Sequence, residues 1–598
     1  MGTSRAKIIG VAVFSYFLVA YSFCCAESGP EFYEEKNVVV PMRDGVKLSA
    51  NIFRPSQEGK FPTLIFRTPY SKDEGDPDNE KTFKHAVKRG YAVVVQDVRG
   101  RFKSEGEFSP YRNEGKDGYD TIEWAASQPW SDGHVGTFGL SYPGAVQWYA
   151  ALENPPHLKA IVPAMVGSTP DQFIYFSGVF EIDWTNWCYR HMSPDARAKK
   201  NLPGPKTYEE ADKEYNRIGM DAINGYLPTL DMPYLKGACP YYYDWLRHGP
   251  YTAYWDWGNL EHRYGKVKAA VLNISGWYDE SYGPQGATKN FMGLVAARKG
   301  WPDPKTQLLI GSWTHGVEST RKAVSGERKF GAAAIIDYDK VVLDFLDHYV
   351  RGIENGVDKQ KPVKAFLMAE DRWLEEDAWP LKGTVETPIY LSRESAAAAK
   401  GDLTWAQTNG AALSSFVSDP ANPVKDNFGT TFGAYNLDYL AARPDVLTFE
   451  TEPFSGPLNV AGNIRAEIYV STEAPDCDLY VKMLDVAPEG TAFNLMSPGM
   501  EVMRVSYRDE TPERKLIKKG EVIKLVFKNL RTGNTFKQGH RLRVQIMGSW
   551  YPTYSRNLQT GESETVSSEI RKAGINIHHS SQYPSRLILP VIPLKSKN

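Results

Sequence analysis

Residues 134–144 read HVGTFGLSYPG, and the fold follows from this stretch. The apolar residues before Ser141 predict a strand that ends at this serine, and residues 145–152 have the pattern of a helix that follows almost at once. A hydroxyl on such a sharp strand-to-helix turn is held exposed above a sheet, and small residues beside it let the two elements pack closely. The amino end of the helix also favours negative charge that develops there.

The spacing around this serine is G-x-S-x-x-G, with Pro143 where the common form of the turn has glycine. That pattern alone occurs often by chance, and a serine at the start of a helix is also a common helix cap. The predicted strand before Ser141 and the predicted helix after it favour a nucleophile over a cap.

The surrounding chain, from about residue 36 to 166, alternates short apolar strands with helical patterns. Residues 38–40 and 46–53 predict a leading hairpin, and residues 122–126 belong to a helix. The buried strands are expected at residues 64–66, 93–95 and 160–162. This alternation predicts an α/β fold, with a largely parallel sheet covered by helices on both faces.

Changes of pattern divide the 598 residues, which are too many for one core. Residues 34–167 and 263–380 carry the alternation of strands and helices and form the predicted catalytic domain. Residues 168–262 are rich in Trp, Tyr, Pro and charge, which predicts helical fragments inserted as a cap. Residues 385–595 alternate apolar with polar side chains, which predicts an all-β sandwich or jelly roll.

A serine nucleophile needs a base, and the base needs an orienting carboxylate. In α/β-hydrolases the acid and then the histidine follow the serine, each just past a later strand. Residues 269–274 predict one such strand, with Asp279 beyond its end, and residues 308–310 predict the next, with His315 beyond its end. Ser141, Asp279 and His315 are therefore the predicted triad of a hydrolase that cuts ester or amide bonds without a metal or other cofactor.

The oxyanion of the tetrahedral intermediate needs hydrogen-bond donors. The backbone N–H of Tyr142, directly after the nucleophile, is one candidate. Tyr70 is the second, because it follows the strand at 64–66 and has a phenol to donate. By position alone, an ordinary aromatic residue of the pocket is the favoured alternative for Tyr70.

Six motifs, in this order along the chain, resemble the CocE/NonD hydrolases. They are RTPYSK (67–72), QDVRG (96–100), GLSYPG (139–144), GWYD (276–279), SWTH (312–315) and RKFG (328–331). That family includes cocaine esterases, X-Pro dipeptidyl-peptidases, glutaryl acylases and α-amino acid ester hydrolases. The resemblance runs from about residue 34 to 595. It implies an α/β-hydrolase domain, a helical cap and a C-terminal jelly roll of galactose-binding-like type, the triad above, and Tyr70 as the oxyanion-hole phenol.

The residues after the triad acid leave the choice of substrate open. By resemblance, α-amino acid ester hydrolases carry an acidic pair that begins two positions after that acid, whereas Ser281 and Tyr282 stand here. Glu280, Ser281 and Tyr282 are the candidate substrate contacts at this place. Glu280 is a candidate for holding an ammonium group, but a glutamate at this place is also common as a supporting or surface residue. Ser281 replaces the bulky apolar residue of a cocaine-esterase acyl pocket, so a pocket for one specific aromatic ester is not supported.

Several functions therefore remain. The first is a carboxylic-ester hydrolase or acylase, and the second is an exopeptidase that releases X-Pro dipeptides. The second needs a cap carboxylate for the substrate amino terminus, for which Asp171 or Glu181 is the candidate. The third is a carbohydrate-binding or scaffold protein with a relic hydrolase domain, and the intact triad counts against it.

The amino terminus is typical of an export signal, since Arg5 and Lys7 precede an apolar run that ends at Phe23. Residues 1–26 are the predicted signal peptide of a periplasmic or secreted protein. An uncleaved anchor and a lipid-modified cysteine are the alternatives. No other stretch approaches the apolar length that a membrane span needs.

The remaining cysteines are Cys188, Cys239 and Cys477. The first two are candidates for a disulfide, and three buried thiols are the slightly favoured alternative. No Cys/His cluster has the spacing of metal ligands. The net charge of −2 indicates neither a nucleic acid nor an anionic membrane as partner. The expected partner is a small ester, an amide or a short peptide, and the sequence leaves the oligomeric state open.

Overall fold

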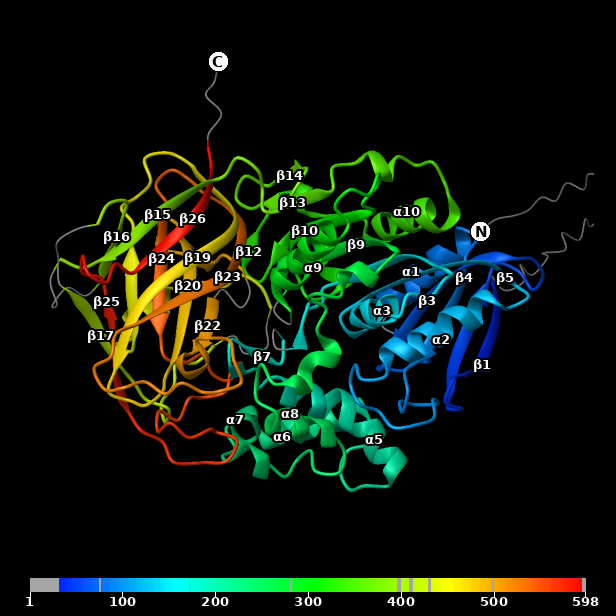
Figure 1. The fold of residues 1–598 in the computed structure, drawn as a ribbon, viewed down its shortest axis with the longest axis horizontal. Coiled ribbons are helices and arrows are strands. Elements are labelled where there is room, and N and C mark those ends of the chain that lie inside the picture. Colours follow the sequence, from blue (N-terminus) through cyan, green and yellow to red (C-terminus); the bar gives the residue numbers. More distant parts are fainter. Residues whose placement is uncertain are drawn as a thin grey trace, which may run out of the picture.

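A computed structural model of the chain describes residues 32–74, 77–170, 173–279, 282–394, 400–407, 412–427, 432–496 and 500–593. The predicted signal peptide lies outside these ranges. Among the residues described, no helix is both long and apolar enough to cross a membrane. Figure 1 shows a sheet covered by helices, a group of short helices below it, and a β domain on the opposite side from the first strands.

A ten-stranded sheet forms the predicted catalytic domain, in the spatial order β1-β2-β4-β3-β5-β6-β9-β10-β13-β14. The strands from β4 to β13 in this order are parallel, whereas β1 and β2 form the predicted antiparallel hairpin at one edge. β4 and β9 are buried along their whole length, as expected for central parallel strands. The strands are β1 (Tyr33–Pro41), β2 (Lys47–Arg54), β3 (Phe61–Thr68), β4 (Ala92–Asp97), β5 (Ser131–Leu140), β6 (Leu158–Ala164), β9 (Ala270–Tyr278), β10 (Thr306–Thr314), β13 (Val363–Leu367) and β14 (Arg372–Glu376).

Helices cover both faces of this sheet, which confirms the predicted α/β class. Leu64 and Ile65 are neighbours on β3 but belong to different cores, because side chains alternate across a strand. Ile65 shares a core with Val146 of α3, and Leu64 shares the other core with Leu346 of α10. The helices are α1 (Pro77–Lys88), α2 (Glu114–Ala126), α3 (Tyr142–Leu152), α9 (Gly283–Ala297) and α10 (Tyr338–Arg351).

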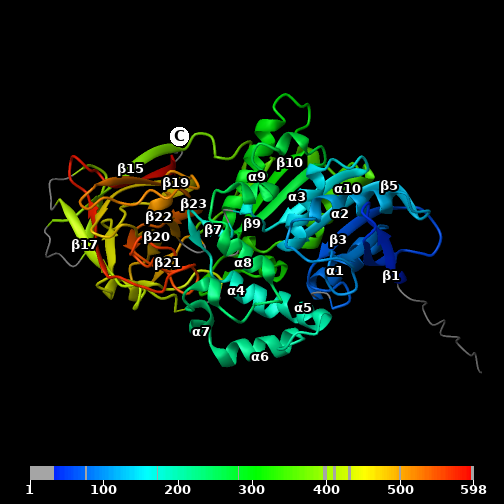
Figure 2. The same cartoon turned by 60° about the horizontal axis from the view of Figure 1, so that its bottom comes forward.

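The chain between β6 and β9 forms the group of short helices over the sheet (Figure 2). Tyr241 of this cap belongs to the same core as Tyr142 of the sheet layer, so the two are packed as one body. Cys188 and Cys239 are buried thiols, with the Cys239 thiol 3.6 Å from the Cys188 carbonyl oxygen. The helices are α4 (Trp184–Trp187), a π-helical turn (Cys188–Met192), α5 (Ser193–Lys200), α6 (Tyr208–Ile218), α7 (Met220–Asn224) and α8 (Pro240–Arg247).

The C-terminal part is a β domain with its own core, as the alternating pattern predicts. Its twelve-stranded sheet is antiparallel in the strand pairs described, apart from β16 beside β18. The strands are β15 (Val385–Ser392), β16 (Gly401–Thr404), β17 (Leu413–Ser418), β18 (Val446–Glu450), β19 (Leu458–Thr472), β20 (Asp478–Val486), β21 (Ala492–Asn494), β22 (Met500–Arg504), β23 (Ile523–Phe536), β24 (Arg541–Met547), β25 (Ala573–His578) and β26 (Arg586–Ile592).

Candidate active site

Ser141 lies on the sharp turn between β5 and α3. Its φ of 66° and ψ of −130° lie outside the regions that side-chain-bearing residues usually occupy, so the turn is strained. Two glycines permit the close packing of strand and helix. A Cβ on Gly144 would lie 2.5 Å from Cγ1 of Val166. A Cβ on Gly139 would lie 2.7 Å from Cβ of Pro143, so neither position accepts a side chain without moving the helix.

Asp279 and His315 directly follow the ends of the adjacent strands β9 and β10. His315 Nδ1 donates to Asp279 Oδ1 at 2.8 Å. The carboxyl group is fully buried, and Ser275 Oγ donates to its second oxygen at 3.3 Å. Because Asp279 engages Nδ1, the basic atom of the neutral imidazole is Nε2.

Ser141 and His315 both line a cavity of about 550 Å³. The ends of the parallel strands form its floor, where ligands bind in open α/β sheets. The cap contributes Trp184 and Trp187, and the β domain contributes Phe432. All three parts of the chain therefore enclose the same space.

Tyr70 follows the end of β3 and lines this cavity, with its phenol in contact with the Ser141 side chain. Nε1 of Trp187 donates to the Tyr70 hydroxyl at 3.0 Å. An indole N–H only donates, so the tyrosine oxygen accepts this bond and its own proton stays available for another acceptor. Burial raises the pKa of Tyr70, against the smaller effects of Trp187 and Ser141, so the phenol keeps its proton at neutral pH.

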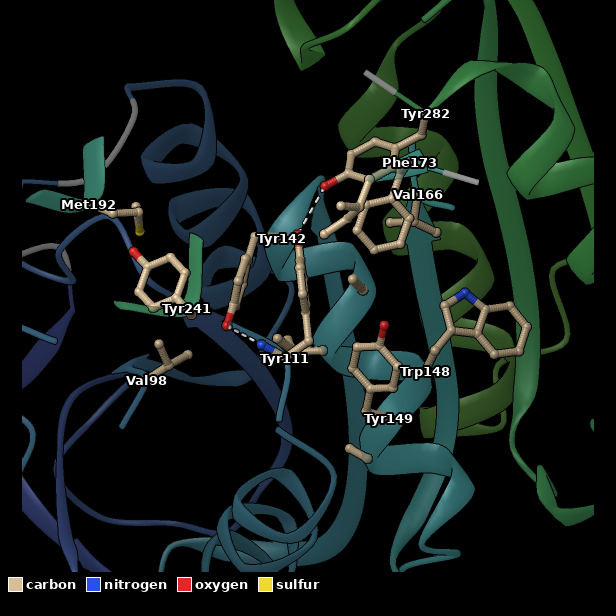
Figure 3. Close-up of a cluster of buried hydrophobic side chains, with 14 of the residues drawn as sticks. Val98, Tyr111, Tyr142, Trp148, Tyr149, Val166, Phe173, Met192, Tyr241 and Tyr282 are labelled. Atoms are coloured by element: carbon tan, nitrogen blue, oxygen red, sulfur yellow. Dashed lines mark hydrogen bonds between the residues drawn. The ribbon is translucent and has the colours of Figure 1, made fainter. Parts of the chain in front are cut away.

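Tyr142 begins α3, where the first N–H groups have no acceptor within the helix. Its phenol is engaged elsewhere, because it donates to Glu114 Oε1 at 2.8 Å. It also accepts from the Tyr111 backbone N–H at 3.0 Å (Figure 3). The Tyr282 hydroxyl contacts the Ser141 side chain and lies 3.2 Å from the Tyr111 hydroxyl. Tyr282, predicted only as a substrate contact, thus lies beside the predicted nucleophile.

The cap adds polar side chains to the cavity that the sequence analysis did not identify. His191 meets Tyr70 edge-on, with 5.9 Å between ring centroids, and burial lowers the pKa of this histidine to about 4. Burial raises the pKa of Asp183 to about 6, against a hydrogen bond from Asn186. Glu181, the predicted candidate for a substrate amino terminus, lines the same cavity.

Arg328, from the RKFG motif, ties the acid-bearing strand to the β domain. Its guanidinium is buried and donates to the Tyr278 hydroxyl at 3.2 Å and to Asn534 Oδ1 at 2.7 Å. Tyr278 is the last residue of β9, directly before Asp279. The arginine thereby fixes the position from which the carboxylate projects.

Three predicted substrate residues, Asp171, Glu280 and Ser281, lie outside the described residues. No group of three or more His, Cys, Asp or Glu side chains suited to a metal ion occurs in the part of the chain that the structure describes.

Comparisons with known proteins identify the family. Two protein families match the chain. The family described as X-Pro dipeptidyl-peptidase (S15 family) matches residues 44–317. The family described as X-Pro dipeptidyl-peptidase C-terminal non-catalytic domain matches residues 355–588. Cocaine esterase of Rhodococcus sp. (strain MB1 Bresler) is 31% identical over 578 residues, which cover 93% of this chain and 98% of the esterase.

Solved structures share the fold over nearly the whole chain. An aminopeptidase from a marine sediment archaeon, Thaumarchaeota archaeon, aligns with a TM-score of 0.79 at 22% identity, over 97% of this chain and 99% of that one. An α-amino acid ester hydrolase aligns with a TM-score of 0.78 at 24% identity, over 97% of this chain and 100% of that one. With 31% identity to cocaine esterase over 93% of its length, the chain belongs to the CocE/NonD family of serine hydrolases, enzymes that act on ester or amide bonds.

Proposed function

We propose that this protein hydrolyses carboxylic esters through an acyl-enzyme on Ser141. His315 Nε2 takes the serine proton as the hydroxyl oxygen attacks the carbonyl carbon, and Asp279 holds the tautomer and stabilises the imidazolium. The alcohol leaves with the proton that His315 returns. Water then attacks the acyl-enzyme with the same histidine as base, and the acid product and free Ser141 result. The hydrogen bond of 2.8 Å between His315 and Asp279, at the cavity that Ser141 also lines, carries the proposal.

In this proposal the oxyanion is stabilised by the Tyr70 phenol and the Tyr142 backbone N–H. Support for the phenol comes from its contact with Ser141 and from the Trp187 bond, which leaves the phenolic proton free to point at the developing charge.

A second candidate is the cleavage of amides or esters whose acyl group carries a free ammonium, as X-Pro dipeptidyl-peptidases require. The observation that favours it is the pair of cap carboxylates, Glu181 and Asp183, in the lining of the catalytic cavity. A carboxylate within a few ångströms would attract such an ammonium group.

Three chromogenic substrates separate the candidates: p-nitrophenyl acetate, alanine p-nitrophenyl ester and Gly-Pro p-nitroanilide. The ester proposal predicts turnover of both esters at a kcat/KM far above that of the anilide. An anilide turned over faster than either ester would replace it with the exopeptidase. Turnover that persists unchanged in Ser141→Ala would contradict both.

We further propose the finer organisation of the chain. Residues 1–26 act as a cleaved export signal, supported by the positive start and the apolar run. The catalytic domain comprises residues 34–167 and 263–380, the cap residues 168–262, and a jelly roll residues 385–595. The mass of the mature protein purified from the native compartment tests the cleavage, since an intact Met1 would refute it.

A further inference from the structure

A second cavity lies where the cap, the catalytic domain and the β domain meet. We call it the junction cavity; it has a volume of about 560 Å³ and shares no lining residue with the catalytic cavity. Asp256 from the cap, Gln285 from α9, and Glu501 and Arg531 from the β domain are among its lining residues. Charged and amide side chains predominate, so the junction cavity suits a polar ligand.

Arg531 is the unusual residue of this lining. It is only 3% exposed, and its Nε donates to Asn463 Oδ1 at 2.8 Å. Within the described chain its buried Nη1 makes no hydrogen bond, and no ion pair joins the guanidinium to a carboxylate. Burial lowers the pKa of this arginine to about 10, with Glu501 as the opposing charge. A buried guanidinium that forms no ion pair is costly, so its presence at a cavity wall points to an anion that completes it.

The other cations of the junction cavity already have partners. Lys289 Nζ bonds Glu261 at 3.0 Å, and Lys528 Nζ bonds Glu510 at 2.9 Å. Arg531 is therefore the cation that an incoming anion would engage. The surrounding carboxylates would repel a ligand with more than one negative charge.

The other polar side chains of the lining can form hydrogen bonds with hydroxyl groups of a ligand. Amide side chains such as Asn259 and Asn529 both donate and accept hydrogen bonds, and Asp256 is an exposed acceptor. Tyr251 and Trp255 add aromatic surface to the wall. We propose that the junction cavity binds a small ligand with one carboxylate and several hydroxyl groups, the carboxylate bonded to Arg531 and the hydroxyls to the amides.

Titration calorimetry on the whole protein tests this proposal. The probes are D-glucuronate, D-glucose as the same ring without a carboxylate, acetate as a carboxylate without hydroxyls, and inorganic phosphate. We expect saturable binding of glucuronate, with glucose and acetate each at least about tenfold weaker, because each loses one set of hydrogen bonds. Glucose that binds as tightly as glucuronate would overturn the role of Arg531, and phosphate as the tightest binder would overturn the ligand class. Failure of every probe to bind would overturn the site.

Substitutions test whether the ligand binds at Arg531. Arg531→Gln should abolish glucuronate binding and leave p-nitrophenyl acetate hydrolysis unchanged, because the two cavities are separate. Arg465→Gln, a matched change on the same sheet at a residue that lines neither cavity, should bind as the unaltered protein does. If Arg531→Gln does not fold, Arg531→Lys keeps the charge without the planar fork and should bind at least about tenfold more weakly. Undiminished binding in the folded Arg531 variant would refute the assignment.

Discussion

The two walls of the catalytic cavity are built differently. On the sheet wall, Ser141, Asp279 and His315 each directly follow a strand of one parallel sheet, so the hydrogen-bond ladders fix their backbones. On the cap wall, Asp183 directly precedes the four-residue helix α4, and Trp187 is its last residue. The chain then continues into a π-helical turn. The sheet wall is therefore rigid, whereas the cap wall depends on packing between side chains distant in sequence.

This difference assigns separate tasks to the walls. A rigid wall suits groups that must meet the reacting atoms within a fraction of an ångström. The side chains of an irregular wall can differ between relatives without moving the reacting groups. Such a wall can therefore determine which substrate binds. We therefore expect changes on the sheet wall to lower kcat for every substrate, and changes on the cap wall to have smaller effects that depend on the substrate.

The largest effect is expected for Ser141→Ala. Removal of the proposed nucleophile should lower kcat for p-nitrophenyl acetate by about 10⁶-fold, the scale at which a triad nucleophile acts. The midpoint of thermal unfolding should stay unchanged, since the two side chains share the Cβ that meets the strained turn. A loss below tenfold in the folded variant would place the nucleophile elsewhere.

Tyr70→Phe is expected to have the next largest effect. Loss of the phenolic donor should lower kcat by about 10²–10³-fold with little change in KM, because the donor acts on the oxyanion more than on the bound ester. Tyr282→Phe is the matched control, as its hydroxyl also contacts Ser141. The reverse order of losses in the two variants would transfer the oxyanion role to Tyr282.

Trp187→Phe probes the point where the cap wall supports the sheet wall. It keeps an aromatic ring but removes the N–H that bonds Tyr70, so kcat should fall by about 2- to 12-fold, the equivalent of one hydrogen bond of about 0.5–1.5 kcal/mol. In the Tyr70→Phe background the same change should cost nothing further, since its acceptor is gone. Additive losses would mean that Trp187 contributes only packing.

Asp183→Asn is expected to have the smallest and most selective effect. Because burial holds the pKa of Asp183 at about 6, its carboxyl is neutral below that pH and ionised above it. The ratio of kcat/KM for alanine p-nitrophenyl ester to that for p-nitrophenyl acetate should rise by up to about fivefold from pH 5 to 7. The ratio cancels pH effects on the catalytic steps that both substrates share.

The asparagine variant is the control for this pH dependence. Its ratio should stay flat over the same range, provided that Asp183 is the titrating group. A rise of equal size in the variant would exclude Asp183 as the titrating group.

The sheet wall could be predicted from the sequence because its signals are local. An apolar run followed by Asp279 or His315 marks the carboxyl end of a strand, and parallel strands bring such ends to one edge. The apolar runs located the strands but not their ends: residues 308–310 lie in the first half of β10, which extends from Thr306 to Thr314. Polar and glycine residues in that strand obscure its ends from a reading of apolar runs alone.

The cap wall could not be predicted in the same way. The bond between Trp187 and Tyr70 joins residues 117 positions apart, and nothing in the local pattern of either marks the other. The aromatic side chains of residues 168–262 are compatible with a core as well as with a pocket wall. Most of them belong to the core that includes Tyr142, and Phe173 and Tyr241 are drawn with it in Figure 3. Only packing decides which of them reach the substrate.

Covalent labelling tests the central claim most directly, namely that Ser141 is activated by His315 and Asp279 on the sheet wall. The protein is treated with a fluorophosphonate, and the adduct is located by mass spectrometry of the intact chain and its peptides. The account predicts one adduct per chain, on Ser141, that is absent in Ser141→Ala and forms far more slowly in His315→Ala. An adduct on another residue, or labelling that persists in Ser141→Ala, would contradict it.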